Sequence, residues 1–513
     1  NTSLNFNLRG HVYIQAGLRP ALLKHKLVNV LVEACLCSGA KDTTTNPGKP
    51  PKLSNKKWRK KFRNKPASNE HLPWEERLAD AVTPLWRLSY HDQLQLKQKH
   101  QERILLQLSD QLLCGESTQH KALTQCPSPP RSTKLSFPLL PILPSPVRDG
   151  YRNKSTFSVN RGVDGNPKTV GFYVGTGKVG NIVCVNGDHL LNMPERHKLV
   201  ARCYQDFLRL SALEPCLLFH DGGHWREVTV RTNAAGHTMA IVYFHPQRLT
   251  PEEIEVHKSS LVEYFTQGPG AICQLDSLYF QESSMTRCSH EESPYQLLHG
   301  QPHIHEEILG FKFRISADAF FQVNQGAADS LYRTVREMGL PNGAREGGGG
   351  GTLLDVCCGT GAIGITMSPR ADRVIGIELI QQAVEDARHN AALNQIQNCE
   401  FLPGKAEVVL PGLMEVLGST TDSGGPLTAV VNPARAGLHY RVIRTLRNHS
   451  SIRRLLYISC KPEGEAMRNF RELCCSPDPH RKLTGEAFRP TVAVPVDMFP
   501  HTPHCELLLV FER

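Results

Sequence analysis

The sequence has no long hydrophobic run. None of its 513 residues lies in a stretch of 18 consecutive apolar residues, about the length that a transmembrane helix needs. The nearest candidate, residues 27–37, is short and is interrupted by Glu33. We therefore expect no membrane-spanning segment and no membrane partner.

The sequence also lacks cysteines at metal-binding spacing. Its 16 cysteines include no Cys-x-x-Cys pair and no Cys/His set with the spacing of a zinc finger. A chain of this length can bury hydrophobic cores without disulfides, so we interpret the cysteines as reduced thiols in an intracellular compartment. We expect no metal site.

Acidic residues are scarce near the N-terminus. Residues 1–65 contain 14 Lys and Arg but only 2 Asp and Glu, a net charge of +12, which leaves 45 basic and 47 acidic residues in the remainder. The net charge of +10 for the whole chain is therefore no indication that its main body binds nucleic acid. An RNA site in that body must consist of a local patch.

The basic segment, residues 1–70, has the pattern of an import presequence. Arg9, Arg19 and Lys24 are scattered among apolar residues, and residues 56–63 form a dense basic run with two aromatics. Three other interpretations stay open from the residues alone: a solvated tail, a nuclear address and an arm that contacts RNA.

Residues 71–147 lead into the main body. The pattern from Trp74 to Cys114 is helical with a break at Pro84, and residues 115–147 contain seven prolines, which predicts a linker or an extended strap. The apolar stripe of the helical part consists of Leu94, Ile104, Leu105, Leu108 and Leu112.

Residues 148–304 are predicted to form an antiparallel α+β module that binds RNA. At its entrance Arg152 and Lys154 alternate with aromatic residues that include Phe157. Cations can hold phosphates while rings stack on unpaired bases, so we predict that these three side chains contact RNA; an ordinary strand edge is the alternative. The β-prone runs of the module lie at 155–159, 170–174, 182–185, 227–231 and 239–244.

Residues 305–513 alternate between strand and helix patterns. We expect an α/β domain with a doubly wound, seven-stranded, Rossmann-like sheet whose ligands lie at the carboxyl ends of its strands. An amphipathic helix is predicted over 380–394. The predicted strands lie at 353–356, 374–378, 399–402, 427–431, 455–459, 491–496 and 506–511.

The first of these strands runs into a candidate cofactor loop. Asp355 is followed by Cys357, Gly359 and Gly361, and glycines let backbone amides approach a ligand. Glu378 ends the next strand 23 residues after Asp355, where an acid suits the hydroxyls of a ribose.

Two cofactors fit this loop pattern, and an ordinary buried strand and turn without a ligand is the third alternative. Gly359, Gly361 and Gly364 satisfy the dinucleotide pattern G-x-G-x-x-G, which indicates a nicotinamide cofactor. Asp355 would repel a pyrophosphate but not a cationic sulfonium. We therefore predict that the loop binds S-adenosylmethionine.

Other strand ends carry polar or nucleophilic residues. The fourth strand of the domain runs into Asn432 and Arg435, the fifth into Cys460, and the last begins with Glu506. A cysteine at this edge, close to Lys461 and a following helix, is expected to have a lowered pKa and to act as a nucleophile. The alternative for Cys460 is a buried, inert thiol. The alternative for Glu506 is a solvated carboxylate at the start of a strand.

These motifs, in this order, resemble the RNA 5-methyluridine methyltransferase family. The resemblance covers roughly residues 148–513, and it implies an S-adenosylmethionine-dependent methyltransferase fold, an RNA substrate and no metal. The segments that carry it are YRNK at 151–154, FFQVN at 320–324, DVCCGTG at 355–361, NPARAGL at 432–438, ISC at 458–460 and FPHTPHCE at 499–506.

The resemblance implies roles for individual residues. Cys460 matches the nucleophile that adds to carbon 6 of a uracil, and Glu506 matches the base that removes the proton from carbon 5. The positions that match contacts to S-adenosylmethionine are Gln322, the loop with Asp355, Cys357, Gly359 and Gly361, Glu378, and Asn432.

The chain departs from the family in places. Asn432 stands where some members have Asp, and the interval from Cys460 to Glu506 is longer than in bacterial members, with a loop insertion near Pro477. The cysteine spacing of the iron–sulfur branch is absent, so we expect no cluster. Arg435 is expected either to hold the flipped base or to position Cys460.

The resemblance also implies a location and a substrate. Residues 83–90, TPLWRLSY, are most similar to an animal mitochondrial branch of the family, which favours the presequence interpretation and a place in the mitochondrial matrix. We expect a monomer that methylates transfer RNA in its T-loop, with ribosomal RNA as a second candidate. A non-catalytic RNA-binding or folding factor and a nicotinamide-dependent oxidoreductase are the other function classes.

Overall fold

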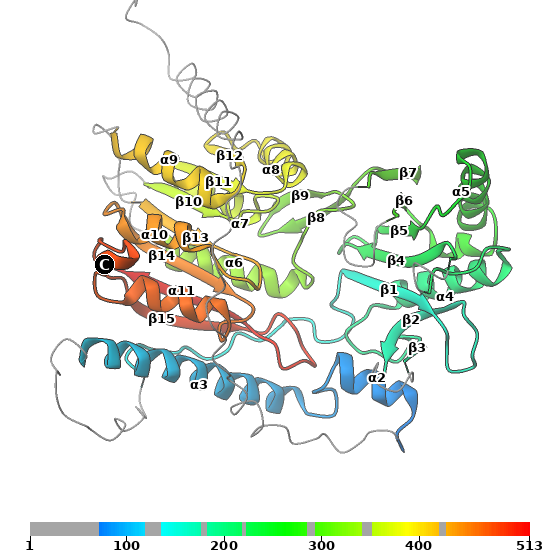
Figure 1. The fold of residues 1–513 in the computed structure, drawn as a ribbon, viewed down its shortest axis with the longest axis horizontal. Coiled ribbons are helices and arrows are strands. Elements are labelled where there is room, and N and C mark those ends of the chain that lie inside the picture. Colours follow the sequence, from blue (N-terminus) through cyan, green and yellow to red (C-terminus); the bar gives the residue numbers. More distant parts are fainter. Residues whose placement is uncertain are drawn as a thin grey trace, which may run out of the picture. The chain divides into compact units, whose positions relative to one another are not determined.

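The computed structural model describes residues 71–117, 135–175, 182–217, 222–284, 293–340, 351–419 and 427–513 (Figure 1). All of them belong to one compact unit, residues 54–513. The basic segment 1–70, with its predicted presequence, lies outside the described residues.

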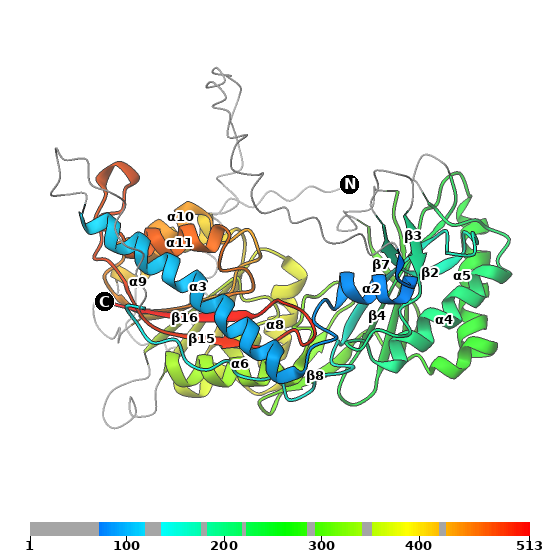
Figure 2. The ribbon, with the colours of Figure 1, turned by 90° about the horizontal axis from the view of Figure 1, so that it is seen from below.

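Within the described residues, two helices precede the first sheet. Helix α2 (Trp74–Val82) and helix α3 (Tyr90–Ser117) confirm the predicted helical pattern and its break at Pro84. Helix α3 lies beside α11 (Glu465–Cys474), as Figure 2 shows. It buries Ile104, Leu105 and Leu108 of the predicted stripe.

The described part of the proline-rich segment, residues 135–147, is a strap rather than a free linker. Its backbone runs parallel to the edge strand β15 (Arg489–Val496). Leu140 N donates to Ala493 O and Leu143 N donates to Pro495 O, both at 2.9 Å. The prolines suit this place because an edge position leaves half of the backbone donors without a ladder partner.

The first seven-stranded sheet has the order β3-β2-β1-β4-β5-β6-β7. The prediction of a purely antiparallel module is wrong at one pair: β5 and β6 are parallel, because helix α5 (Pro251–Thr266) crosses over between them. Helix α4 (Glu195–Leu210) belongs to the same module. The strands are β1 (Lys154–Asn160), β2 (Thr169–Val174), β3 (Val183–Val185), β4 (Trp225–Thr232), β5 (Thr238–Phe244), β6 (Ser277–Glu282) and β7 (Tyr295–Gly300).

A hairpin and a helix follow before the second sheet begins. Strands β8 (Ile304–Ile308) and β9 (Phe311–Ile315) pair with each other, and α6 (Gln325–Gly339) comes next. The side chain of Asn324 caps α6 by accepting a hydrogen bond from Ala327 N at 3.1 Å. Residues 320–324 are thereby fixed between the hairpin and the helix.

The second sheet has the order β12-β11-β10-β13-β14-β16-β15, which confirms the predicted doubly wound fold. Its strands are β10 (Thr352–Val356), β11 (Arg373–Glu378), β12 (Cys399–Pro403), β13 (Leu427–Val431), β14 (Ile452–Ser459), β15 and β16 (Glu506–Glu512). Helices α6, α7 (Ala362–Met367) and α8 (Gln381–Leu393) form one layer, and α9 (Ala406–Ser419), α10 (Tyr440–Asn448) and α11 form the other (Figure 2).

Strand direction in this sheet assembles the site. Strands β10, β11, β13 and β14 are parallel, whereas β16 runs antiparallel to β14. The first residue of β16 is therefore at the same edge as the last residues of the parallel strands. Glu506, the first residue of β16, therefore lies at the same edge of the sheet as Glu378 and Ser459, which are the last residues of β11 and β14.

Candidate active site

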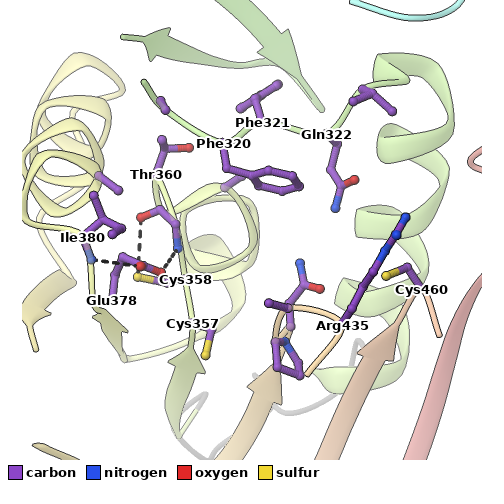
Figure 3. A pocket seen from close by; sticks show the side chains of 18 of the residues that line it. Phe320, Phe321, Gln322, Cys357, Cys358, Thr360, Glu378, Ile380, Arg435 and Cys460 are labelled. Carbon is purple, nitrogen blue, oxygen red and sulfur yellow. Dashed lines mark hydrogen bonds between the residues drawn. The ribbon is translucent and has the colours of Figure 1, made fainter. Parts of the chain in front are cut away.

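One cavity of about 1340 Å³ lies at this edge of the second sheet. Figure 3 shows a close view of it, with Glu378 and the two adjacent cysteines on one side and Arg435 and Cys460 on the other. We call the part at the ends of β10 and β11 the cofactor side, and the part at the ends of β13 and β14 and the start of β16 the reaction side.

Glu378 is the centre of the cofactor side. One of its carboxylate oxygens accepts a hydrogen bond from Gly359 N at 3.0 Å, and the other accepts from Leu379 N at 2.8 Å and Ile380 N at 3.1 Å (Figure 3). These bonds fix the carboxylate at the cavity wall. The oxygen that accepts from Gly359 N retains acceptor capacity for a hydroxyl group.

The loop after β10 is a tight turn in the left-handed region. The φ angle is +64° at Cys357, +55° at Gly359 and +80° at Gly361. Cys357 and Gly359 line the cavity, as predicted for ligand contacts, but Gly361 does not. A Cβ at Gly361 would lie 2.9 Å from the ring of Phe401, so that glycine is required for packing.

Asp355 lies behind the loop rather than in the cavity wall. It is fully buried, and it accepts a hydrogen bond from Gly364 N at 2.8 Å. Burial raises its pKa to about 7, although the bond from Gly364 opposes that shift. This carboxyl lies at the start of α7, where a dinucleotide would place its pyrophosphate, so the loop does not fit the nicotinamide alternative.

Gln322 and Asn432, which match contacts to S-adenosylmethionine in the family, line the cavity. Gln322 is 7% exposed, and its backbone carbonyl accepts a hydrogen bond from the side chain of Asn153 at 2.8 Å. The backbone nitrogen of Asn432 donates to Val356 O at 3.3 Å, which continues the pairing of β13 with β10. Both side chains are therefore placed by backbone contacts.

Cys460 and Arg435 meet on the reaction side. Figure 3 shows the two side chains next to each other. The predicted lowering of the Cys460 pKa is wrong for this state of the protein: burial and the nearby Glu506 raise it, and Arg435 opposes them.

Glu506 is buried, which excludes the solvated alternative. It is 4% exposed and lines the cavity, and burial raises its pKa to about 7 while Arg435 lowers it. A carboxyl with a pKa near neutral can accept and release a proton under physiological conditions. The reaction side therefore combines a thiol, a guanidinium and a proton acceptor.

The predicted RNA contacts divide into two groups. Arg152 and Lys154 line the cavity, and burial with repulsion from Arg231 lowers the Lys154 pKa to about 8. Phe157 is only 1% exposed and packs against Phe172 with ring centroids 5.2 Å apart. Its predicted contact with RNA is wrong, because alternate residues of β1 face the core of the first sheet.

Sequence reasoning missed other residues of the cavity wall. Phe320 is 67% exposed and projects between the two sides in Figure 3, whereas its neighbour Phe321 is buried. His504 and Thr502 also line the cavity. The signal for Phe320 was its place two residues before Gln322, in a motif that was assigned to the cofactor alone.

Two kinds of feature are absent from the part of the chain that the structure describes. It contains no group of three or more His, Cys, Asp or Glu side chains that could hold a metal ion. Nor is any helix within the same ranges long and apolar enough to cross a membrane.

Comparisons with known proteins agree with this geometry. The tRNA (uracil-5-)-methyltransferase homolog B of Danio rerio is 69% identical over 468 residues, 91% of this chain and 92% of that protein. The human homolog B is 58% identical over 442 residues, 86% of this chain and 84% of that protein. The mouse tRNA (uracil-5-)-methyltransferase homolog A is 42% identical over 445 residues, 86% and 70% of the two chains.

Two further matches concern the fold and the C-terminal domain. The crystal structure of Pyrococcus abyssi tRNA (uracil-54, C5)-methyltransferase in complex with S-adenosyl-L-homocysteine superposes with a TM-score of 0.56 at 22% identity, covering 83% of this chain and 84% of that one. Residues 309–513 match the family described as tRNA (Uracil-5-)-methyltransferase. The resemblance predicted from the motifs is thus confirmed, and this chain belongs to the tRNA (uracil-5-)-methyltransferase family.

Proposed function

We propose that this chain transfers a methyl group from S-adenosylmethionine to carbon 5 of a uridine in transfer RNA, through a covalent bond between Cys460 and carbon 6. The observation that carries the proposal is the convergence of Cys460, Arg435 and Glu506 on the reaction side of a cavity whose other side presents Glu378.

The cofactor side has the groups that S-adenosylmethionine needs. Glu378 offers acceptors for the ribose hydroxyls. Leu379 is 57% exposed and Ile380 is 48% exposed beside it, and together they offer apolar surface to an adenine ring. When bound, S-adenosylmethionine supplies an electrophilic methyl group.

The reaction side has the groups that uracil chemistry needs. The Cys460 thiol first gives up its proton to solvent, and the thiolate Sγ forms a bond to carbon 6 while the electron pair of the double bond between carbons 5 and 6 moves onto carbon 5. Carbon 5 then accepts the methyl group as the bond between that group and its sulfonium sulfur breaks. Glu506 then takes the proton from carbon 5, the bond between sulfur and carbon 6 breaks, and the double bond of the ring returns. Arg435 is the group placed to stabilise the thiolate, since the Cys460 pKa is otherwise raised.

The RNA must present an unstacked uridine to this cavity. Taking a base out of its stack costs on the order of a few kcal/mol. Phe320 offers an exposed ring for the flipped base or its neighbour, and Arg152 and Lys154 offer cations for the flanking phosphates. A non-catalytic RNA-binding factor would not need Cys460 and Glu506 at one cavity.

The sequence pattern of the basic segment supports a place for this reaction in the mitochondrial matrix. Ribosomal RNA is a second candidate substrate, because its loops also present unpaired uridines. Deletion of residues 1–65 should abolish mitochondrial import and leave methylation by the purified protein unchanged. Correct import of the truncated protein would contradict the location. Mapping 5-methyluridine in cells without the protein tests both RNA substrates.

Glu506→Gln tests the proposed chemistry. The amide keeps the shape of the carboxylate but cannot take the carbon-5 proton, so addition and methyl transfer should occur and the methylated uracil should stay bound to Cys460. We expect an RNA–protein adduct that carries the methyl label and survives denaturing electrophoresis. The double variant Cys460→Ala, Glu506→Gln should lack it. Release of free methylated RNA at the wild-type rate would assign the base to another group, with His504 in the cavity wall as the candidate.

A further inference from the structure

The loop that leads into Glu506 is held by residues from the far end of the chain. This loop, residues 497–505, joins β15 to β16 and contains most of the FPHTPHCE motif. Residues 85–97 and 149–151, which we call the brace, bond to four of its residues. We propose that the brace positions Glu506 for proton removal. This inference rests on the proposed function.

The brace holds the loop where its backbone is strained. His501 has a φ of +66°, a left-handed conformation that a non-glycine residue adopts only when its surroundings impose it. Its amide nitrogen donates to the side-chain oxygen of Gln93 at 2.8 Å, and its carbonyl accepts from Leu85 N at 2.9 Å. Tyr151 donates its hydroxyl hydrogen to Pro500 O at 3.2 Å.

The same bonds fix the ring of His501. Gln93 Oε1 accepts a hydrogen bond from the backbone nitrogen of His501, so Gln93 Nε2 faces the imidazole ring. Gln93 Nε2 donates to His501 Nδ1 at 3.3 Å and to Leu88 O at 3.1 Å. The other ring nitrogen therefore carries the hydrogen and donates to Asp149 Oδ1 at 2.7 Å. His501 is thus anchored away from the cavity, where it cannot act as the base.

A buried charge pair holds the start of the loop. The side chains of Lys97 and Asp497 form an ion pair with no exposed surface. Lys97 also donates to Phe499 O at 3.0 Å, and Tyr90 donates to the second carboxylate oxygen of Asp497 at 2.9 Å. Such a pair keeps one geometry, because separating its members would leave an uncompensated buried charge.

No residue of the brace lines the cavity. The brace includes most of the TPLWRLSY segment, which has no role in the reaction chemistry described above. The brace also lies outside residues 309–513, the part of the chain that matches the family. Its residues are therefore positioning residues that act through the loop. Their loss should slow the step that uses Glu506 more than the step that uses Cys460.

Gln93→Leu tests this role, with Gln95→Leu as the matched control on the exposed face of α3. RNA labelled with tritium at carbon 5 reports proton removal, and the methyl-labelled adduct reports the earlier steps. We expect Gln93→Leu to slow tritium release at least about tenfold, because a small displacement of a catalytic group has effects of this size, while adduct formation stays within about twofold. Gln95→Leu should match the wild type.

The controls separate failure of this inference from failure of the proposed function. If Glu506→Gln forms neither an adduct nor methylated RNA, the proposed function is overturned, and the inference with it. If it instead releases free methylated RNA at the wild-type rate, another group is the base, and the inference about Glu506 alone is overturned. The positioning role alone would be overturned if Glu506→Gln forms the adduct but Gln93→Leu slows adduct formation and tritium release equally. It would also be overturned if Gln93→Leu slows neither step. Tyr151→Phe removes one hydroxyl and carries the test if Gln93→Leu does not fold; tritium release at the wild-type rate in that variant overturns the inference.

Discussion

The cofactor side and the reaction side of the cavity are built by different means. Glu378 is fixed by backbone amides no more than 19 positions away, at the ends of two adjacent strands. The loop before Glu506 is fixed by side chains about 408 positions away. The cofactor side is therefore a local motif, whereas the reaction side depends on the whole described chain.

The largest expected effect is on the methylation rate, and it distinguishes Cys460 on the reaction side from Cys357 on the cofactor side. Cys460→Ala should lower the methylation rate by at least about 10³-fold, because the nucleophile is lost, while RNA and S-adenosylmethionine still bind. Cys357→Ala should retain turnover, since burial and the nearby Glu378 raise the pKa of that thiol to about 12. Rapid-quench assays with transcribed RNA measure both rates. Turnover by Cys460→Ala near the wild-type rate would exclude the covalent route.

Glu378→Ala should damage the cofactor side alone. Losing a charge-assisted hydrogen bond costs about 1.5–3 kcal/mol, so the affinity for S-adenosylmethionine should fall roughly 10- to 150-fold. The affinity for RNA should not change. Calorimetry measures both, and Glu385→Ala, an exposed carboxylate on α8, is the control. Unchanged cofactor affinity would remove Glu378 from the ribose site.

Phe320→Ala should weaken RNA binding, because this exposed ring projects between the two sides. Loss of one stacked base costs about 1–3 kcal/mol, or roughly 5- to 150-fold in affinity. Phe157→Ala is the contrasting variant: it should lower the free energy of unfolding by about 3–5 kcal/mol, because that ring is in the core. Filter binding and thermal unfolding distinguish the two, and equal RNA affinity for Phe320→Ala and wild type would contradict the stacking role.

The contrast between the two sides also explains what the sequence could predict. The strand ends at Asp355 and Glu378 follow from local hydrophobic patterns, and the parallel order then places Asn432 and Cys460 at the same edge. The burial of Phe157 could also have been predicted, because Val159, two residues later, shares its face of the strand.

The reaction side was harder to predict for physical reasons. The raised pKa of Cys460 comes from burial and from Glu506, which reaches it only because β16 is antiparallel. The bonds between Gln93 and His501 join segments that no local pattern relates. The position of Asp355 behind its loop, rather than in the cavity, likewise depends on its bond to Gly364.

The smallest expected effect compares two buried carboxyls, Asp355 on the cofactor side and Glu506 on the reaction side. Burial raises the pKa of each to about 7, above the ordinary value near 4 of an unfolded chain. Between these values the folded protein holds protons that the unfolded chain has released. The contribution of the two protonated carboxyls to the free energy of unfolding is therefore fully present below about pH 4 and is lost as pH rises through about 7. The loss is at most about 1.4 kcal/mol per pH unit for each group.

Activity should depend on pH in the opposite direction, because Glu506 can act as a base only when it is ionised. Methylation by the wild type should therefore rise through about pH 7 while the unfolding temperature falls. Asp355→Asn, whose amide oxygen can still accept from Gly364 N, should flatten the stability curve and leave the activity curve in place. Glu506→Gln should flatten the stability curve too, and it should remove the activity. Thermal unfolding from pH 5 to 8 measures the slopes, and an unchanged slope for Glu506→Gln would show that this carboxyl is already ionised in the free protein.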